Sequence, residues 1–182
     1  TYFDDENRHK LTAGLSFNYD FYDEHLATNR LTNGLFDNIR DEFTPGLFAE
    51  SDFKYDEKLS LLVGVRADWS NYYGLFCTPR FNIRYSPWTW WNLRASVGLG
   101  YRSPNVLTDN AAIFASNRQI VLTEERFAQE RAINAGISTT FYIPLGSKEL
   151  QLSADYYYTH FVECVVADMD SDPHSITFSN LN

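Results

Sequence analysis

The residues best suited to metal chemistry lie in an acidic segment near the end of the chain. Asp168, Asp170 and Asp172 place three carboxylates at alternate positions, as calcium-binding loops do. Pro173 stands where such a loop needs glycine, and Ser179 stands where it needs a bidentate glutamate, which excludes an EF-hand. Two interpretations remain open for these three residues: a looser extracellular calcium or ligand site, and a solvated acidic loop.

The nucleophiles and bases of the chain form no catalytic set. The four histidines are scattered over different predicted turns and strands: His9, His25, His160 and His174. Ser171 and Ser175 flank His174 in sequence, but a Ser-His-acid site needs side chains that converge in space. We therefore expect a protein that is not an enzyme and that holds no cofactor other than the calcium considered above.

The elements that position these residues are strands, and the clearest is 91–102. Its odd positions are apolar: Trp91, Leu93, Ala95, Val97, Leu99 and Tyr101. Its even positions are polar or small: Asn92, Arg94, Ser96, Gly98, Gly100 and Arg102. Successive side chains of a strand point to opposite faces, so this is one long strand with an apolar and a polar face. An apolar band about six side chains tall with aromatic ends is typical of a strand that crosses a bilayer.

The same alternation recurs along the chain. It predicts further strands at 11–22, 43–55, 59–69 with a continuation toward 73, 78–85, 133–143 and 150–162. Residues 1–3 read as the tail of a preceding strand, and 177–182 as a strand cut partway. Short turns at 56–58, 86–89 and 144–148 alternate with longer connections at 23–42, 103–130 and 168–174. We predict an all-β antiparallel meander of about eight long amphipathic strands from a large transmembrane β-barrel, with residues 1–182 forming one partial barrel domain.

The placement of charge is the sharpest support for a membrane face. Nine charged residues in mid-strand all occupy polar positions: Glu50, Asp52, Lys54, Arg66, Asp68, Arg80, Arg84, Arg94 and Asp155. The apolar positions of the predicted strands carry no Asp, Glu, Lys or Arg, and their one histidine is His160, which we place near a strand end. A soluble antiparallel sandwich or lipocalin-like barrel also alternates, but its apolar face is the interior. Such an interior would have to hold an unusual number of aromatic rings.

Composition agrees with a barrel. The 182 residues are 16% aromatic, yet the mean hydropathy is −0.37, because alternation hides an apolar face from any average along the chain. No run approaches the roughly 18 apolar residues of a transmembrane helix. The net charge of −9 argues against nucleic acid as a partner.

The two cysteines are expected to stay apart. In a simple meander Cys77 and Cys164 lie three strands apart, roughly 14 Å at about 4.8 Å per strand. A disulfide needs Cα atoms within about 7 Å. We predict that no disulfide joins them.

Three segments together resemble the barrel of TonB-dependent outer-membrane receptors. Residues 93–104, ending Gly100-Tyr101-Arg102-Ser103-Pro104, resemble a strand of that family with its glycine-aromatic-Arg-small-Pro ending. Residues 78–87 look like the hairpin half that precedes it, and 130–137 look like the strand entry that follows the next loop. The segment 155–161 is similar to receptors from Bacteroides-like bacteria.

The resemblance implies a Gram-negative outer-membrane receptor with about 22 strands around a plug domain. Its partners would be outer-membrane lipid, its own plug, a TonB-type energy-coupling protein and a scarce small nutrient such as a metal chelate, cofactor or glycan. No plug, energy-coupling box or terminal aromatic strand is visible, so we expect a slice of the barrel that cannot transport alone. The alternatives are a non-transporting outer-membrane barrel, either adhesin or surface hydrolase, and a soluble ligand-binding β-barrel.

The candidate ligand contacts lie at the predicted outer mouth of the barrel. They are Tyr72, Tyr73, Asn105, Asp109, Asn117 and Arg118. For the charges of the polar face we expect cross-strand pairing and contact with a plug.

Overall fold

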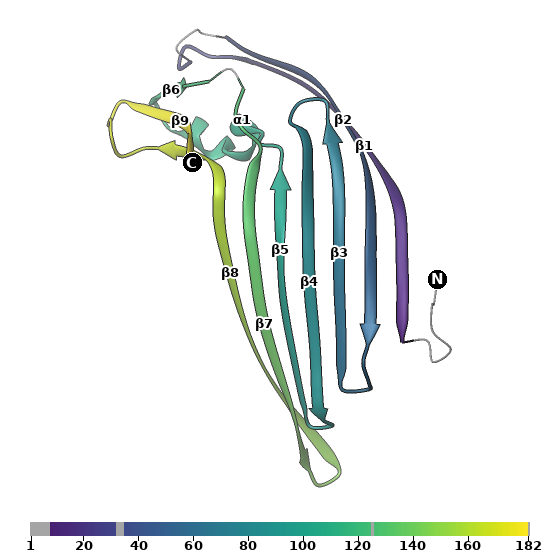
Figure 1. The fold of residues 1–182 in the computed structure, drawn as a ribbon. Coiled ribbons are helices and arrows are strands. Elements are labelled where there is room, and N and C mark those ends of the chain that lie inside the picture. The colour runs from purple at the N-terminus through teal and green to yellow at the C-terminus, as the bar shows by residue number, and fades with distance from the viewer. Residues whose placement is uncertain (1–7, 32–34, 125, 182) are drawn as a thin grey trace.

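A computed structural model describes residues 8–31, 35–124 and 126–181. The predicted strand tail at 1–3 lies outside these residues. The described strands form a nine-stranded sheet in the order β1-β2-β3-β4-β5-β7-β8-β9-β6 (Figure 1). The long strands are β1 (His9–Ala27), β2 (Leu35–Lys54), β3 (Leu59–Ser70), β4 (Gly74–Trp88), β5 (Trp91–Arg102), β7 (Glu130–Leu145) and β8 (Lys148–Asp168). They pair antiparallel with their neighbours, which confirms the predicted meander.

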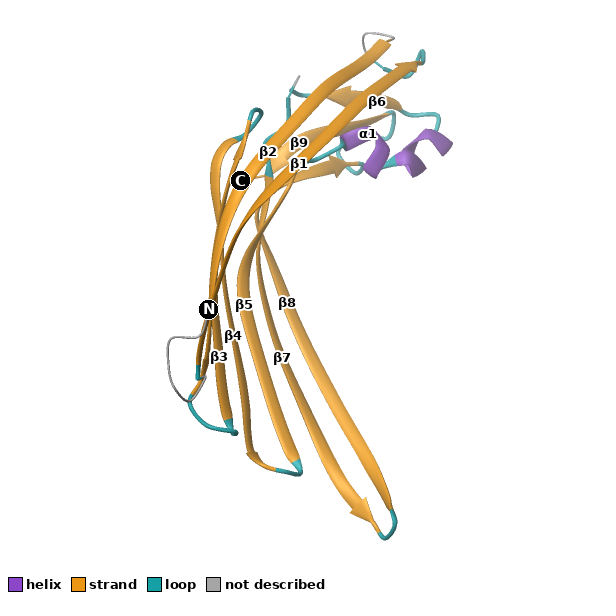
Figure 2. Ribbon diagram, turned by 90° about the vertical axis from the view of Figure 1, so that its right-hand side faces the viewer, coloured by secondary structure: helices purple, strands orange, loops and turns teal. Residues whose placement is uncertain are grey.

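The remaining elements are short and lie at one end of the sheet (Figure 2). They are α1 (Val106–Asp109), the 3-10 helix η1 (Ala111–Ala115), β6 (Gln119–Leu122) and β9 (Ser175–Leu181). Strand β9 pairs antiparallel with β8 and parallel with β6. Neither described helix is long and apolar enough to span a membrane.

The strand register places residues of the same kind opposite each other across the sheet. One row of cross-strand partners from β2 to β8 is apolar throughout: Phe53, Leu61, Ile83, Ala95, Ile137 and Tyr156. The row beside it is mostly polar or small: Asp52, Leu62, Asn82, Ser96, Gly136 and Tyr157. A slip of one residue in any strand would mix the two sets. We call these surfaces the apolar face and the polar face.

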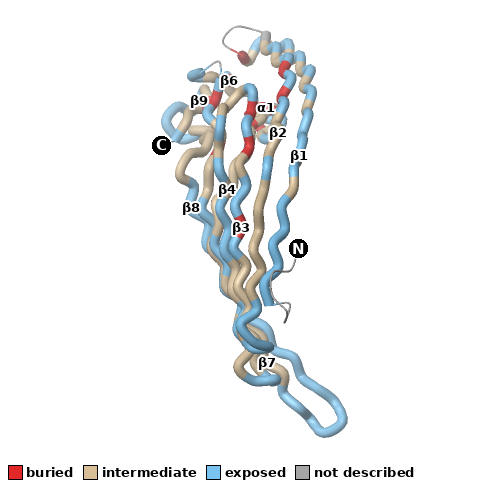
Figure 3. Tube along the Cα trace, turned by 45° about the vertical axis from the view of Figure 1, so that its right-hand side comes forward, coloured by how far each residue is buried: buried red, intermediate tan, exposed pale blue. Residues whose placement is uncertain are grey.

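The apolar face has no cover within the described chain. Leu47 is 58% exposed, Val63 54% and Val97 45%, although all three lie well inside their strands. Figure 3 shows intermediate and exposed residues along most of the sheet's length. Lipid would cover a face of this kind in a transmembrane barrel.

The two ends of the sheet differ in the length of their connections, as predicted. The turns at 55–58, 89–90 and 146–147 lie at one end, here the turn end. The connections 103–129 and 169–174 and residues 28–31 after β1 lie at the other, here the loop end (Figure 1). The connection at 71–73 is the exception, because it is short although it lies at the loop end.

The prediction of a polar connection at 23–42 is wrong for most of that segment. Strands β1 and β2 continue through it as a paired hairpin, with Glu24 opposite Asn38 and Tyr22 opposite Arg40. On the apolar side this extension carries Asp23, His25, Asp37 and Asp41. Exclusion of charge is therefore confined to the apolar band, and the hairpin projects beyond it. The alternation failed as a guide here because charged residues enter the apolar side, while Leu26 and Phe36 on the polar side pack against buried residues of the loops.

Two further details of the charge pattern need correction. Strand β7 begins at Glu130, so Arg131 occupies the apolar side, where its Nη2 pairs with Glu163 Oε1 at 3.3 Å beside a bulge. His160 is not near a strand end, because β8 runs on to Asp168 and places it opposite Ile133.

A packed hydrophobic core lies at the loop end. Its buried residues come from six segments: Leu31, Val106, Leu107, Ile113, Ile120, Phe127, Ile176 and Phe178. We call this set the loop core. Ile120 joins it through a parallel bridge to Leu31 and through the pairing of β6 with β9. The connection 103–129 is thus a folded unit.

Both cysteines are free, as predicted. Cys77 lies on β4 and Cys164 on β8, and β5 and β7 separate the two strands.

Candidate ligand site at the loop end

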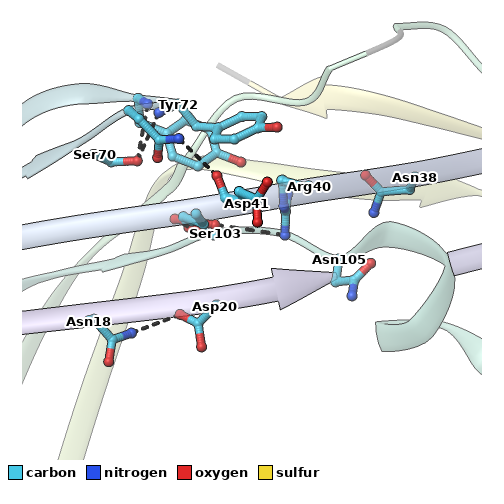
Figure 4. Close-up of polar contacts among 12 residues, drawn as sticks. Asn18, Asp20, Asn38, Arg40, Asp41, Ser70, Tyr72, Ser103 and Asn105 are labelled. Carbon is cyan, nitrogen blue, oxygen red and sulfur yellow. Dashed lines mark hydrogen bonds and ion pairs between the residues drawn. The ribbon is translucent and has the colours of Figure 1, made fainter. Parts of the chain in front are cut away.

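A cavity of about 640 Å³ lies between the upper part of β2, the 71–73 turn and the connection that follows β5. Its lining includes Asn38, Arg40, Tyr72, Tyr73, Asn105, Arg126 and Phe127. Figure 4 shows Arg40 on β2 with Tyr72 and Asn105 reaching the same region from the other two segments. Strand pairing positions Arg40, because the extended β1–β2 hairpin turns its even-numbered side chains toward the connection. We call this space the ligand cavity.

Arg40 is the most unusual residue of the ligand cavity. It is only 8% exposed, and its guanidinium carbon lies 4.3 Å from the centre of the Tyr22 ring and 5.7 Å from that of Tyr72. Its Nη2 is 3.8 Å from Glu42 Oε2, which is too far for a hydrogen bond. Within the described structure, Nε and Nη2 are buried without a hydrogen-bond partner. Buried donors of this kind normally have an acceptor, so Arg40 is suited to an anionic ligand.

The second cation of the cavity is Arg126. Its guanidinium carbon lies 4.6 Å from the centre of the Tyr72 ring, so Tyr72 contacts both arginines. Aromatic faces attract cations, so the Tyr72 ring stabilises both guanidinium groups. Burial raises the pKa of the neighbouring Tyr73 phenol, and the charge of Arg40 opposes part of that effect. Tyr73 therefore stays protonated at neutral pH and can donate a hydrogen bond.

Glu24 ties the connection to the hairpin beside the cavity. Its carboxylate accepts hydrogen bonds from Thr108 Oγ1 at 2.5 Å, Asn38 Nδ2 at 2.6 Å and Asn105 Nδ2 at 3.0 Å. Burial alone would raise the pKa of Glu24, but these hydrogen bonds outweigh it and lower the pKa. The group is thus an ionised acceptor at neutral pH, above the apolar band. It fixes the start of α1 against β1 and β2.

A second carboxylate anchors the start of the connection. Glu42 is only 6% exposed, and its Oε1 accepts a hydrogen bond from Ser103 Oγ at 2.5 Å. Arg102, the residue before, pairs with Glu130 Oε2 through Nε at 2.6 Å. Both ends of the 103–129 connection are therefore held to strands.

The predicted mouth residues divide into two groups. Tyr72, Tyr73 and Asn105 line the ligand cavity. Asp109 instead accepts a hydrogen bond from the Asn105 amide at 3.1 Å and pairs with Arg102 at 3.1 Å.

Asn117 and Arg118 hold the connection to neighbouring segments. Asn117 Oδ1 lies 3.5 Å from Arg30 Nη2, and Arg118 Nη1 donates to the Met169 carbonyl at 2.7 Å. Ligand contact by any of the six predicted mouth residues remains a prediction.

Sequence reasoning missed Tyr22, Arg40 and Arg126. A signal was present for the first two, because Tyr22, Glu24, Asn38, Arg40 and Glu42 all occupy even positions. That spacing continues the polar face of the adjoining strands. Arg126 offers no comparable signal, since it lies in an irregular segment.

The carboxylates of the acidic segment act on the local backbone. Asp168 Oδ1 accepts hydrogen bonds from the amides of Asp170 and Ser171, each at 3.0 Å. Asp172 accepts from the His174 amide at 2.9 Å and from Ser175 Oγ at 2.8 Å. In the described ranges, no three His, Cys, Asp or Glu side chains are grouped to hold a metal ion. Calcium binding by Asp168, Asp170 and Asp172 remains a prediction.

Comparison with known proteins decides the family. Residues 1–172 match the sequence model of the TonB-dependent receptor-like β-barrel. The chain belongs to this family. No curated protein sequence matches it.

Solved structures of receptors share the fold of this TonB-dependent receptor barrel. The siderophore receptor PirA of Pseudomonas aeruginosa is 17% identical, with a TM-score of 0.63 over 96% of this chain and 31% of that one. A Q482A mutant of the ferric enterobactin receptor PfeA of the same organism, in complex with enterobactin, is 14% identical, with a TM-score of 0.67 over 94% and 29%. The FrpB iron transporter of Neisseria meningitidis is 13% identical, with a TM-score of 0.59 over 95% and 28%. The chain therefore spans less than a third of the length of these proteins.

Proposed function

We propose that this chain is part of the wall of an outer-membrane receptor that imports an anionic metal chelate by TonB-dependent transport. The intact receptor would lie in the outer membrane of a Gram-negative bacterium, enclose its own plug and engage a TonB-type energy-coupling protein. Family membership and the continuous apolar face support this proposal, as do the names of the similar solved structures. A Bacteroides-like source is the finer part of the proposal and rests on residues 155–161.

The buried guanidinium of Arg40 is the observation that carries the choice of ligand. Its Nε and Nη2 are without hydrogen-bond partners in the described structure, inside a cavity that also holds Arg126. A ligand with clustered negative oxygens would accept charge-assisted hydrogen bonds from both donors, which Glu42 at 3.8 Å is too far away to accept, whereas a neutral glycan would form weaker hydrogen bonds there. Among a metal chelate, a cofactor and a glycan, the anionic chelate fits this cavity best.

The test uses the intact receptor and three probes: a ferric tris-catecholate, a neutral corrinoid and a neutral oligosaccharide. We expect the wild type to bind the ferric chelate, and Arg40→Ala to weaken that binding about 10- to 100-fold, as expected for loss of hydrogen bonds to a charged group. Arg80→Ala is the matched control, because Arg80 pairs with Glu50 on the polar face and does not line the cavity. Titration calorimetry on the purified receptor measures all three variants.

Uptake into cells completes the test. Accumulation of the radiolabelled iron chelate should require the energy-coupling protein and should fall in Arg40→Ala cells. Binding of the neutral probes in preference to the chelate would refute the choice of ligand. Uptake that is equal with and without energy coupling would refute the transport mechanism.

A further inference from the structure

Two arginines face each other on the polar face near the turn end. Arg84 on β4 and Arg94 on β5 are direct cross-strand partners, and both are exposed. Like charges directly opposite each other destabilise a sheet. The pair is therefore unfavourable for the sheet by itself.

Other arginines of the polar face are neutralised by a carboxylate of the sheet. Arg66 Nε pairs with Asp68 Oδ2 at 2.7 Å, and Arg102 Nε pairs with Glu130 Oε2 at 2.6 Å. Arg80 pairs with Glu50. In the part of the chain that the structure describes, neither Arg84 nor Arg94 has a hydrogen bond or ion pair. Both guanidinium groups are therefore available to bind a group from outside the described chain.

A hollow of about 510 Å³ surrounds the pair on the polar face. Its lining includes Ser60, Asn82, Arg84, Arg94, Ser96, Gly136, Ser138, Asp155 and Tyr157. Small and aliphatic residues complete the lining, and Tyr157 packs against Gly136, where an added Cβ would lie 2.9 Å from the ring. We call this space the arginine hollow.

The charge of the arginine hollow is positive. Arg84, Arg94 and Asp155 belong to one cross-strand row, in which Ser138 separates Arg94 from Asp155. Two strand spacings amount to roughly 9.6 Å, so Asp155 is not a direct cross-strand partner of either arginine. The hollow thus offers two guanidinium forks and a single carboxylate, with room for one more side chain.

We propose that the arginine hollow binds a carboxylate side chain from the polypeptide that fills the barrel in the intact receptor. This inference rests on the proposed function, which places a plug against the polar face. Two adjacent guanidinium groups can bind one carboxylate through several parallel hydrogen bonds. The occupant is a tethered segment because the hollow is open on the polar face. A free carboxylate would lose its translational freedom there, whereas a tethered one is held at high effective concentration.

Photocrosslinking in the full-length receptor tests the occupant. Benzoylphenylalanine replaces Ser96, which lines the hollow, and in a matched control it replaces Val97 on the apolar face. We expect the probe at Ser96 to crosslink to a receptor peptide that lies outside the barrel wall and contains Asp or Glu. The probe at Val97 should give no such product. A crosslink from Ser96 only to lipopolysaccharide, to another protein or to a peptide without a carboxylate would overturn the proposal.

Charge removal tests the role of the arginines. In the double variant Arg84→Ser/Arg94→Ser the yield of the acidic-peptide crosslink should fall about tenfold, as expected for loss of hydrogen bonds to a charged group. The control Glu50→Ser/Arg80→Ser removes a neutral ion pair from the same face and should leave the yield unchanged. An equal yield in wild type and in Arg84→Ser/Arg94→Ser would overturn the proposal. A persistent crosslink in a receptor that fails to import the iron chelate would refute the transport proposal and leave this one intact.

Discussion

Asn105 donates its side-chain amide to Glu24 Oε1 at 3.0 Å and so joins the segment after β5 to β1, 81 residues earlier in the chain. Thr108 and Asn38 donate to the same carboxylate. Glu24 therefore determines where the connection lies relative to the ligand cavity. Its position makes a first prediction possible.

Glu24→Ala should loosen the start of α1 without unfolding the barrel. Three donors lose their acceptor, and because the carboxylate is only partly buried we expect a modest cost of about 1–2 kcal/mol for local opening. Hydrogen exchange of residues 103–110 measures this opening. Asp20→Ala is the control, since Asp20 accepts from Asn18 on its own strand. Equal exchange in the two variants would contradict the role given to Glu24.

Phe178→Ala should open the loop core. Phe178 is fully buried, and truncation of a buried phenylalanine costs roughly 3–5 kcal/mol. The amides of β6 should then exchange faster, because β6 is held by its parallel pairing with β9. Leu181→Ala on the same strand is the control, since Leu181 is 55% exposed. If protection of β6 survives Phe178→Ala, the loop core does not hold the connection together.

Val97→Arg and Thr159→Arg test the two faces at nearly the same depth in the receptor in lipid. Val97 pairs with Ala135 on the apolar face, and Thr159 pairs with Asn134 in the next row of the polar face. An arginine in the hydrocarbon near the barrel midplane costs roughly 2–4 kcal/mol, so Val97→Arg should be the more destabilising change. Urea unfolding in lipid vesicles measures both.

Spin labels on cysteines at the same two positions distinguish a lipid face from a buried protein interior. The label at position 97 should be relaxed by oxygen, which partitions into lipid, and not by a water-soluble nickel reagent. The label at position 159 should show less preference for oxygen. Access of the nickel reagent to position 97, without any preference for oxygen, would exclude lipid contact there.

Acid should release the turn formed by the acidic segment. The His174 amide, followed by the Ser175 hydroxyl, lowers the pKa of Asp172 by hydrogen bonds to its carboxylate. Because the pKa of Asp172 is lowered in the folded state, its hydrogen bond with the His174 amide stabilises the turn above the ordinary aspartate pKa of about 3.9. This stabilisation is lost as the pH falls through the lowered pKa of the folded state. Exchange of the His174 amide should therefore accelerate in that acidic window. Asp172→Asn should remove this dependence on pH, and an unchanged profile would contradict the assignment.

Much of the sheet follows from local pattern. The alternation over 91–102 predicted β5 with its observed bounds, and the short turns predicted at 56–58 and 144–148 showed which ends of the strands meet. These features are readable because side-chain direction alternates with every residue, whatever the strand contacts. The same pattern predicted strands shorter than the observed β1 and β2. Beyond the apolar band charged residues occupy the apolar side and Leu26 and Phe36 occupy the polar side, so the strands continue where the alternation ends.

The candidate site, unlike the sheet, depends mainly on contacts that the residue pattern could not predict. Position at the mouth was enough to select Tyr72, Tyr73 and Asn105, because the turn and the long connection lie at the loop end of any such meander. It could not select Arg40, whose burial depends on Tyr22 of β1 and Tyr72 of the 71–73 turn packing on the guanidinium. It also could not show that Arg118 reaches the Met169 carbonyl, a contact between residues 51 positions apart.

The two faces, the antiparallel order and the connections at 103–130 and 168–174 could be read from the residue pattern, since each depends on neighbours within a few residues. The pattern could not show that the connection 103–129 packs into the loop core, that Glu24 holds it beside the ligand cavity, or that Arg84 faces Arg94. These are contacts between segments far apart in the chain. They depend on strand register and on the closure of long loops, which no local pattern of residue types encodes.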